Sequence, residues 1–283
     1  MQYPHYTIRT MTRPEVDNAI DWAAAEGWNP GLNDAECFHA ADPNGFFLGL
    51  LGDEPIATIS AVKYGDTFGF LGCYIVKPEQ RGKGYGIALW NAALAYLEGR
   101  TIGLDGVVER QGNYQQSGFA LAHRNIRYQG TGSRECPTGL ACVELSTLPF
   151  DWIEAYDRAF FPAERGTFLR CWINQPHSVA LGILRKGTLA GYGLLRTCRS
   201  GFKIGPLFAD SPNVAERLFL ALQAHAPEAA PVFLDIPEVN PAALDLVRRH
   251  GMVPVFATAR MYLGESPALP INRLFGVTSF ELG

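Results

Sequence analysis

The residues with the clearest chemical potential form one glycine-rich stretch, Gln80-Arg81-Gly82-Lys83-Gly84-Tyr85-Gly86. Glycine carries no Cβ atom, so its backbone can bend sharply and approach a ligand closely. If a helix follows, the free N–H groups of its first turn and the helix dipole favour an anion at that point. Arg81 and Lys83 are expected to add mobile positive charge. The stretch therefore predicts a cradle for a pyrophosphate group.

Three kinds of glycine-rich loop could hold such a group. A P-loop needs Lys-Ser/Thr beside its last glycine, whereas Ile87 and Ala88 follow Gly86. The dinucleotide fingerprint places its glycines in the order G-x-G-x-x-G. This stretch instead runs Arg-x-x-Gly-x-Gly, from Arg81 to Gly86. It resembles the acyl-CoA loop of the GNAT N-acetyltransferases, Gln/Arg-x-x-Gly-x-Gly/Ala. The resemblance implies that acetyl-CoA binds here as a co-substrate and contacts the residues from 80 to 86.

The elements on either side of the loop fit this interpretation. Residues 70–76 are apolar, aromatic and β-branched, which is typical of a strand buried on both faces. Pro78 closes this strand, because proline cannot continue a central ladder. Residues 87–97 have the apolar spacing of a helix. By resemblance, the pantetheine arm would run beside the strand end at Tyr74, Ile75 and Val76, where one N–H group would polarise the thioester carbonyl.

A second motif, Tyr-x-x-x-Gly-Phe, starts at Tyr114, within the predicted short helix 111–117. In the GNAT family a tyrosine at this place lies near the CoA sulfur and protonates the leaving thiolate. A phenol with an ordinary pKa near ~10 suits a thiolate of comparable basicity. The resemblance therefore implies Tyr114 as general acid, with Asn113 as a further cofactor contact. The alternative is that Tyr114 is a packed aromatic residue on a short helix.

The general base is left unassigned. Many GNAT enzymes carry a glutamate on the central strand, but residues 69–76 contain no carboxylate. The remaining candidates, acting through bridging waters, are Asp34, Glu36, Asp66 and Glu109. Because the acceptor amine attacks the thioester directly, no nucleophilic serine or cysteine is required.

The acceptor pocket is expected to involve residues 26–38. Trp28, Asn29 and Asp34 are the predicted substrate contacts, and Asn33 and Phe38 add polar and aromatic groups. An amine acceptor favours a nearby acid, for which Asp34 is the obvious candidate. The alternative for Trp28 is a lid packed over the core.

Further elements are predicted in the first half of the chain. Proline, cap residues and apolar spacing indicate helices at 13–25 and 33–39. Apolar runs bounded by turns indicate strands at 6–10, 46–51, 55–64, 101–104 and 120–128. This order of elements also resembles a GNAT domain.

The second half of the chain repeats the first. Residues 187–195 echo the 54–60 strand, and residues 232–235 echo residues 102–105. Ala190 and Ala57, like Gly251 and Gly118, are 133 residues apart (190 − 57 and 251 − 118). Adding 133 to Leu89 gives Leu222, so the halves align without a gap through the helix predicted at 214–223, and Val214, Arg217 and Phe219 replace Arg81, Gly84 and Gly86. Such a crowded turn cannot cradle a pyrophosphate, so one active site per chain is expected, in the first half.

The runs 201–210, 234–240 and 275–283 resemble the C-terminal domain of YitH-type tandem-GNAT proteins. The resemblance implies an α+β fold (α/β three-layer-like) of two tandem GNAT domains, with mixed, mostly antiparallel sheets flanked by helices. The predicted domains are residues 1–135, with the acetyl-CoA site, and residues 143–283, degenerate and not CoA-binding. Residues 129–142 read as the linker, and the alternating residues 277–282 read as a last strand. One hypothesis is that the second domain forms a wall of the acceptor site, with the residues Tyr192, Lys203, Arg260 and Tyr262. The other hypothesis is that the second domain only supports the structure of the first.

Composition excludes several classes of function. The chain has 47% hydrophobic and 18% charged residues, a net charge of −4 and a pI near 5.9, which argues against a nucleic-acid or anionic-membrane surface. No apolar run approaches the ~20 residues of a membrane span, and no secretion signal is visible. The six cysteines form no C-x-x-C pair and the six histidines show no metal spacing. We expect a reduced, cytoplasmic, metal-free protein that is a monomer or homodimer.

These observations favour an acetyl-CoA-dependent N-acetyltransferase that acts on a primary amine of a small molecule. The alternatives are an acyl-CoA-binding sensor without turnover and a protein or peptide N-acetyltransferase. The sequence does not choose the acceptor, or between acetyl and a longer acyl group.

Overall fold

The computed structural model describes residues 5–133, here the first half, and residues 142–283, the second half. Residues 134–141, most of the predicted linker, lie outside the described residues. The first half contains β1 (Tyr6–Thr10), α1 (Arg13–Ala25), α2 (Asp34–Ala41), β2 (Phe46–Leu51), β3 (Glu54–Tyr64), β4 (Phe68–Val76), η1 (Pro78–Gln80), α3 (Tyr85–Tyr96), β5 (Thr101–Val107), η2 (Val108–Arg110), α4 (Gln111–Gln116) and β6 (Ala120–Thr131).

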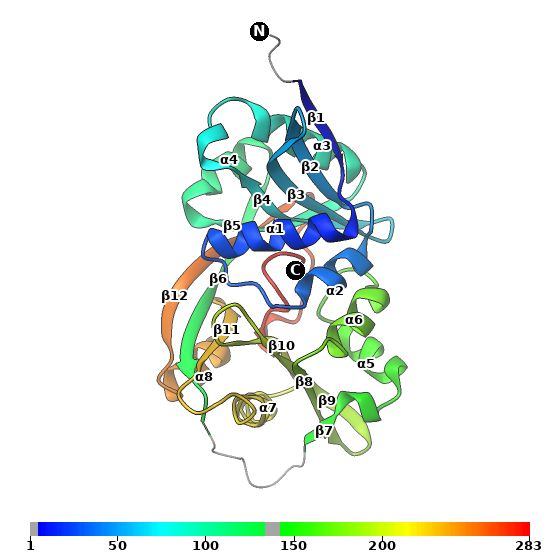
Figure 1. Ribbon diagram of the computed structural model, residues 1–283. Coiled ribbons are helices and arrows are strands. Elements are labelled where there is room, and N and C mark those ends of the chain that lie inside the picture. Colours follow the sequence, from blue (N-terminus) through cyan, green and yellow to red (C-terminus); the bar gives the residue numbers. More distant parts are fainter. Residues whose placement is uncertain (1–4, 134–141) are drawn as a thin grey trace.

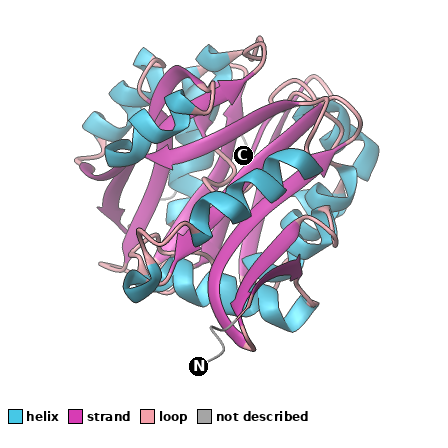
Figure 2. Cartoon of the chain, turned by 90° about the horizontal axis from the view of Figure 1, so that it is seen from above, coloured by secondary structure: helices cyan, strands magenta, loops and turns pink. Residues whose placement is uncertain are grey.

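The second half repeats this order. It contains β7 (Cys142–Glu144), η3 (Leu145–Thr147), α5 (Phe150–Asp157), α6 (Gly166–Ile173), β8 (Ser178–Arg185), β9 (Thr188–Thr197), β10 (Phe202–Ala209), α7 (Pro212–Gln223), β11 (Pro231–Pro237), α8 (Pro241–Arg249), β12 (Val253–Leu263), η4 (Ile271–Arg273) and β13 (Leu274–Gly276). The two halves lie one above the other in Figure 1, and helices cover both sides of the strands in Figure 2. The predicted tandem α+β architecture is confirmed.

Each half contributes one long strand, β6 or β12, that pairs with a strand of the other half. The strands form one mixed, mostly antiparallel sheet in the order β1-β2-β3-β4-β5-β12-β6-β11-β10-β9-β8-β7, with β13 beside β10. Strand β12 of the second half therefore pairs with β5 of the first, and β6 of the first half pairs with β11 of the second. In Figure 1, β6 and β12 run side by side from one half to the other. The halves thus share backbone hydrogen bonds as well as side-chain contacts.

Each exchanged strand carries an arginine that pairs with an aspartate of the other half. Arg127 on β6 makes a bidentate ion pair with Asp235 on β11, with both N–O distances at 2.7 Å. Arg260 on β12 binds Asp105 on β5 at 2.5 Å. Both pairs join residues directly opposite in the strand register and are buried. A different strand register would separate these partners and leave uncompensated buried charges, which is costly. The two ion pairs therefore fix the register in which β6 and β12 pair with the strands of the other half.

The hydrophobic core is continuous across the two halves. One cluster packs residues of α2, β2 and β3 against α5, α6 and β9, and includes Phe38 stacked on Trp172 with ring centroids 6.0 Å apart. Two further clusters lie under α3 in the first half and under α7 and α8 in the second. Because the central cluster draws on both halves, we infer that neither buries its apolar surface alone.

The segment predicted as a last strand is not a strand. The strand β13 ends at Gly276, and the chain then turns at Phe280–Leu282, where the Leu282 N–H donates to the Ser279 hydroxyl at 3.0 Å. All residues from 277 to 283 are buried, because the segment passes between the halves, where the C-terminal end appears in Figure 1. Its alternating apolar pattern reflects burial in this crevice instead of sheet pairing.

The gapless alignment of the two halves is also wrong. Eight residues, 77–84, separate β4 from α3, but only Asp210 and Ser211 separate β10 from α7. Val214, Arg217 and Phe219 therefore lie within α7 and replace nothing in the loop. The Ser211 hydroxyl caps α7 by accepting from the Val214 N–H at 3.4 Å. This helix start lacks a glycine loop, and that supports the prediction of a single CoA site in the first half.

Candidate active site

A cavity of about 770 Å³ opens where two parallel strands separate. Strands β4 and β5 pair only from Phe68–Thr101 to Leu71–Leu104. Both strands then continue, β4 to Val76 and β5 to Val107, without pairing to each other. Their facing edges line the cavity and leave backbone groups free for an extended ligand arm.

A β-bulge in β4 lies at the inner end of this split. Ser60 of β3 pairs with Gly72, but Thr58 pairs with Ile75, so β4 has one extra residue between these points. Cys73 within the bulge has φ +47°, which is rare for a residue with a side chain. Bulges bend a strand and redirect its side chains. Here the bulge accompanies the divergence of β4 from β5.

The glycine loop forms the outer end of the cavity. Gly82 and Gly84 have φ +76° and +87°, and a Cβ added at either would meet nothing within 4 Å. Glycine is therefore required by the backbone conformation and not by crowding. Gly84 is the N-cap of α3, with no side-chain cap, and within the described backbone none of the N–H groups from 82 to 87 donates to a carbonyl. These unused donors, at the N-terminus of a helix, fit a pyrophosphate.

Arg81 is held in place, although the sequence suggested a mobile charge. Its Nε donates to the Val76 carbonyl at 2.8 Å, and its Nη2 binds the Glu26 carboxylate at 2.5 Å. Lys83 Nζ donates to Gln80 Oε1 at 3.1 Å. Arg81 thus braces the loop against the end of β4 and against α1.

Tyr114 lies on the wall of the cavity beside β5. Its ring covers Gly106, where an added Cβ would stand 2.1 Å from Cε2, and its centroid is 5.6 Å from that of Trp90. Burial, followed by the nearby Tyr74, raises the pKa of Tyr114 to about 12. The phenol is therefore protonated at neutral pH, which is the form that a general acid needs.

The cavity gathers most of the predicted cofactor residues. Those that line it are Tyr74, Ile75, Val76, Gln80, Arg81, Gly82, Gly84, Gly86 and Asn113, together with Tyr114. Lys83 and Tyr85 belong to the loop but do not line the cavity. Tyr85 packs against Tyr6, with ring centroids 4.8 Å apart.

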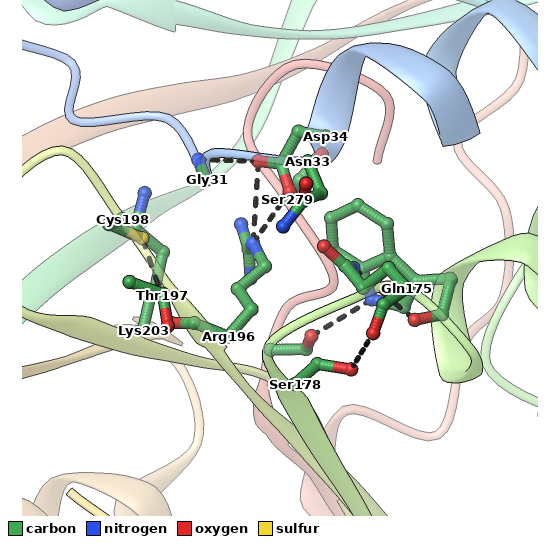
Figure 3. Close-up of polar contacts among 12 residues, drawn as sticks. Gly31, Asn33, Asp34, Gln175, Ser178, Arg196, Thr197, Cys198, Lys203 and Ser279 are labelled. Carbon is green, nitrogen blue, oxygen red and sulfur yellow. Dashed lines mark hydrogen bonds and ion pairs between the residues drawn. The ribbon is translucent and has the colours of Figure 1, made fainter.

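Of the predicted substrate contacts, Trp28 lines the cavity and the other two bind the second half instead. Asn29 exchanges two hydrogen bonds of 2.9 Å with the backbone of Ser200. Figure 3 shows Asp34 bound by Arg196, at 3.0 Å, and by the Gly31 N–H, at 2.7 Å. Both members of this ion pair are almost completely buried. Asn29 and Asp34 therefore hold the halves together.

The candidate bases from the sequence do not line the cavity. Asp34 is engaged by Arg196. Glu36 pairs with Arg13 at 2.8 Å, and Asp66 lies 3.7 Å from Arg100 with a fully exposed side chain. Glu109 is exposed on η2.

The second half does contribute to the cavity, but through other residues than those predicted. Tyr192 hydrogen-bonds Asp157 within its own half, and Lys203 donates to the Asn29 carbonyl at 2.8 Å. Arg260 is engaged by Asp105, and Tyr262 belongs to the central core. The second-half residues that line the cavity are Phe256 and Thr258 of β12 and Phe280 and Glu281 of the C-terminal segment.

Sequence reasoning missed these four residues, and also Trp90 and residues 104–107. Trp90 lies within the helix predicted at 87–97, and residues 104–107 continue the strand predicted at 101–104, so both were within reach of the predicted elements. The four second-half residues reach the site only through the strand exchange and the crevice segment. No local pattern signals either arrangement.

Proteins of one known family are similar to this chain over its whole length. Residues 13–119 match the model of the Acetyltransferase (GNAT) family, and residues 153–276 match an acetyltransferase (GNAT) domain. Holothin acyltransferase from Pseudoalteromonas sp. (strain SANK 73390) is 31% identical over all of this chain and 96% of its own length. The chain belongs to the GNAT acyltransferase family. It is an enzyme of that family, and acyl-CoA is the co-substrate of the fold.

Two further acetyltransferases and a tandem GNAT protein are similar to this chain. The uncharacterized N-acetyltransferase YitH of Bacillus subtilis (strain 168) is 27% identical over 75% of this chain and 76% of its own length. A putative acetyltransferase from Pyrococcus horikoshii superimposes with a TM-score of 0.84 at 26% identity, covering 100% of this chain and 98% of its own. A tandem GNAT protein from the clavulanic acid biosynthesis pathway gives 0.64 at 14% identity, over 93% and 100%. The last likeness concerns the fold alone.

No group of three or more His, Cys, Asp or Glu residues in the described ranges could hold a metal ion. No helix within residues 5–133 and 142–283 is long and apolar enough to cross a membrane.

Proposed function

We propose that this GNAT enzyme transfers an acetyl group from acetyl-CoA to a primary amine of a small molecule. The observation that carries the proposal is the convergence of two features on one cavity. The glycine loop, with its unused N–H groups, forms one end, and Tyr114 lies on the wall beside β5. A pyrophosphate at the loop would direct the pantetheine arm along the free edge of β4.

The reaction then needs only direct attack. The amine nitrogen bonds to the thioester carbonyl carbon, and the carbon–sulfur bond breaks. A backbone N–H at the end of β4 polarises the carbonyl oxygen, a contribution of about 2–4 kcal/mol for one such donor. Tyr114 gives its phenolic proton to the leaving thiolate, and the nitrogen loses one proton in exchange.

The aromatic part of the cavity lining suggests an acceptor with a flat apolar part. Trp28, Phe256 and Phe280 belong to this lining. Arg127 holds the group together: its Nη1 donates to the Trp28 carbonyl at 2.7 Å, and its guanidinium lies 4.9 Å from the centroid of Phe280. Aromatic walls of this kind bind planar or apolar groups. Holothin acyltransferase is similar to this chain over its full length and is named for its action on holothin. We therefore include holothin among the acceptors to test.

A thiol-release assay tests the proposal. Acetyl-CoA is offered with a panel of small amines, holothin and a peptide with a free amino terminus. We expect release with at least one small amine in the wild type and none in Gly84→Glu, because the new carboxylate would stand at the pyrophosphate position. Gly99→Glu is the matched control: Gly99 has φ +81° and open space, as Gly84 does, but does not line the cavity.

The control separates backbone strain from lost anion binding. Equal loss in the two variants would point to strain alone. Release with the peptide only would favour a peptide N-acetyltransferase. Binding of acetyl-CoA without thiol release for any acceptor would favour the alternative of an acyl-CoA-binding sensor without turnover.

A further inference from the structure

Three acidic residues line the cavity, and the carboxylates of two of them are already engaged. Glu26 binds Arg81. Asp105 accepts from Asn125 at 2.8 Å and from Thr258 at 3.3 Å, in addition to its ion pair with Arg260. The third is Glu281 of the C-terminal segment. Within the described residues, no hydrogen bond or ion pair reaches its carboxylate, although the residue is only 4% exposed.

Glu281 lines the cavity and its carboxylate has no partner among the described residues, so it is available to a ligand or to a bridging water. The central strand β4 has no carboxylate of its own, and at Gly72 it has no side chain at all. A Cβ on Gly72 would stand 2.0 Å from the Glu281 carbonyl oxygen. The main chain of Glu281 therefore occupies the space that a side chain of the central strand would fill.

The segment that carries Glu281 is firmly held. The Tyr64 hydroxyl donates to the Leu282 carbonyl at 3.1 Å, and the Leu282 N–H donates to Ser279. The ring of Phe280 packs beside Arg127. Anchors on both sides of Glu281 fix its backbone, as a catalytic group requires.

The groups that act on Glu281 come from three elements. Burial is the main cause that raises the pKa of the Cys73 thiol on β4, and the charge of Glu281 is the next. For Arg127 on β6 and Arg196 on β9, burial lowers the pKa and nearby carboxylates, Glu281 among them, raise it above its ordinary value. The charge of Glu281 thus acts on the bulge of the central strand and on two buried arginines.

We propose that Glu281, carried by the C-terminal segment of the second half, is the general base that removes the proton from the acceptor amine. This inference rests on the proposed function. The base acts on the nitrogen directly or through one water, while the carbon–nitrogen bond forms and the carbon–sulfur bond breaks. Glu281 gains one proton, Tyr114 loses one to the thiolate, and solvent restores both. The second half therefore completes the active site of the first.

Glu281→Gln tests the role of Glu281, because it keeps the shape of the side chain and removes its ability to accept a proton. We expect kcat/KM for the amine to fall by about 10²-fold or more at pH 7. The affinity for acetyl-CoA, measured by calorimetry, and the melting temperature should stay close to those of the wild type. The deficit should shrink as the pH rises toward the pKa of the amine, because the acceptor then arrives deprotonated.

Parallel variants keep the test decisive. Glu281→Asp retains a carboxylate and should lose less activity than Glu281→Gln while keeping the wild-type form of the pH profile. If Glu281→Gln does not fold, Glu281→Ala carries the test, and an unchanged kcat in Glu281→Ala would overturn the inference. Glu109→Gln tests the exposed alternative, and a loss confined to that variant would also overturn it. So would a wild-type pH profile in Glu281→Gln, or parallel loss of acetyl-CoA binding and stability. A wild type that acetylates no amine would instead refute the proposed function itself.

Discussion

The carbonyl oxygen of Glu281 lies 2.0 Å from the position that a Cβ atom on Gly72 would occupy. Gly72 is on the central strand of the first half, and Glu281 is on the C-terminal segment of the second. The contact joins the two halves at the inner end of the cavity. It also explains how a residue more than two hundred positions away can serve a site built on β4.

Gly72→Ala should disturb this contact. The new methyl group meets backbone, which cannot rotate away, so the segment must shift. We expect a loss of about 1–3 kcal/mol in the free energy of unfolding, measured by urea denaturation, together with a fall in kcat. Gly112→Ala is the matched control for stability, since an added Cβ there meets nothing within 4 Å and its φ is not positive. Equal stability of the two variants would show that the contact at Gly72 is not tight.

Tyr114→Phe should affect chemistry more than binding. The ring keeps its contacts with Gly106 and Trp90, but the phenolic proton is lost. We expect kcat to fall by about 10²-fold, with the calorimetric affinity for acetyl-CoA little changed. Tyr128→Phe, on β6 and outside the cavity, controls for the loss of a phenol elsewhere. A kcat close to that of the wild type would remove Tyr114 from the reaction.

Asp34→Asn should act through stability. The change leaves Arg196, which is 1% exposed, without its carboxylate partner. We expect a loss of about 3–5 kcal/mol in the free energy of unfolding, much of it recovered in the double variant with Arg196→Met. If Asp34→Asn instead raised KM for the amine while stability stayed unchanged, Asp34 would be a substrate contact, as the sequence suggested.

Much of this architecture could be predicted from the sequence. The strand 6–10, the helix 13–25 and the strand 46–51 match the structure residue for residue, because caps and turns mark their ends. The glycine loop and Tyr114 were found from their motifs. The partners of β6 and β12 were not, because strands of similar pattern fit either neighbour and the exchange is decided by long-range pairing. Glu281 was missed for the same reason: only the path of the crevice segment brings it to β4.

The stability of the protein should fall between pH 6.5 and 4.5. Burial, followed by the charge of Arg260, lowers the pKa of His123 to about 4. Below the ordinary value of 6.5, the unfolded chain takes up a proton that the folded chain does not. The stability is therefore present above pH 6.5 and is lost as the pH falls through about 4, at up to about 1.4 kcal/mol per pH unit.

The variant His123→Gln isolates this contribution. Its free energy of unfolding should vary less with pH over the same interval, as measured by urea denaturation at several pH values. Glu15 does not interfere, because its pKa of about 2, lowered chiefly by Arg9, places its titration below this interval. The same slope in both proteins would count against the buried neutral histidine.

The central claim is one acyl-CoA site per chain, formed in the first half and completed by the second. Isothermal titration calorimetry with acetyl-CoA tests it most directly. The account predicts a stoichiometry of one per chain, binding abolished by Gly84→Glu, and binding retained by Gly99→Glu. A stoichiometry of two, or undiminished binding in Gly84→Glu, would contradict it.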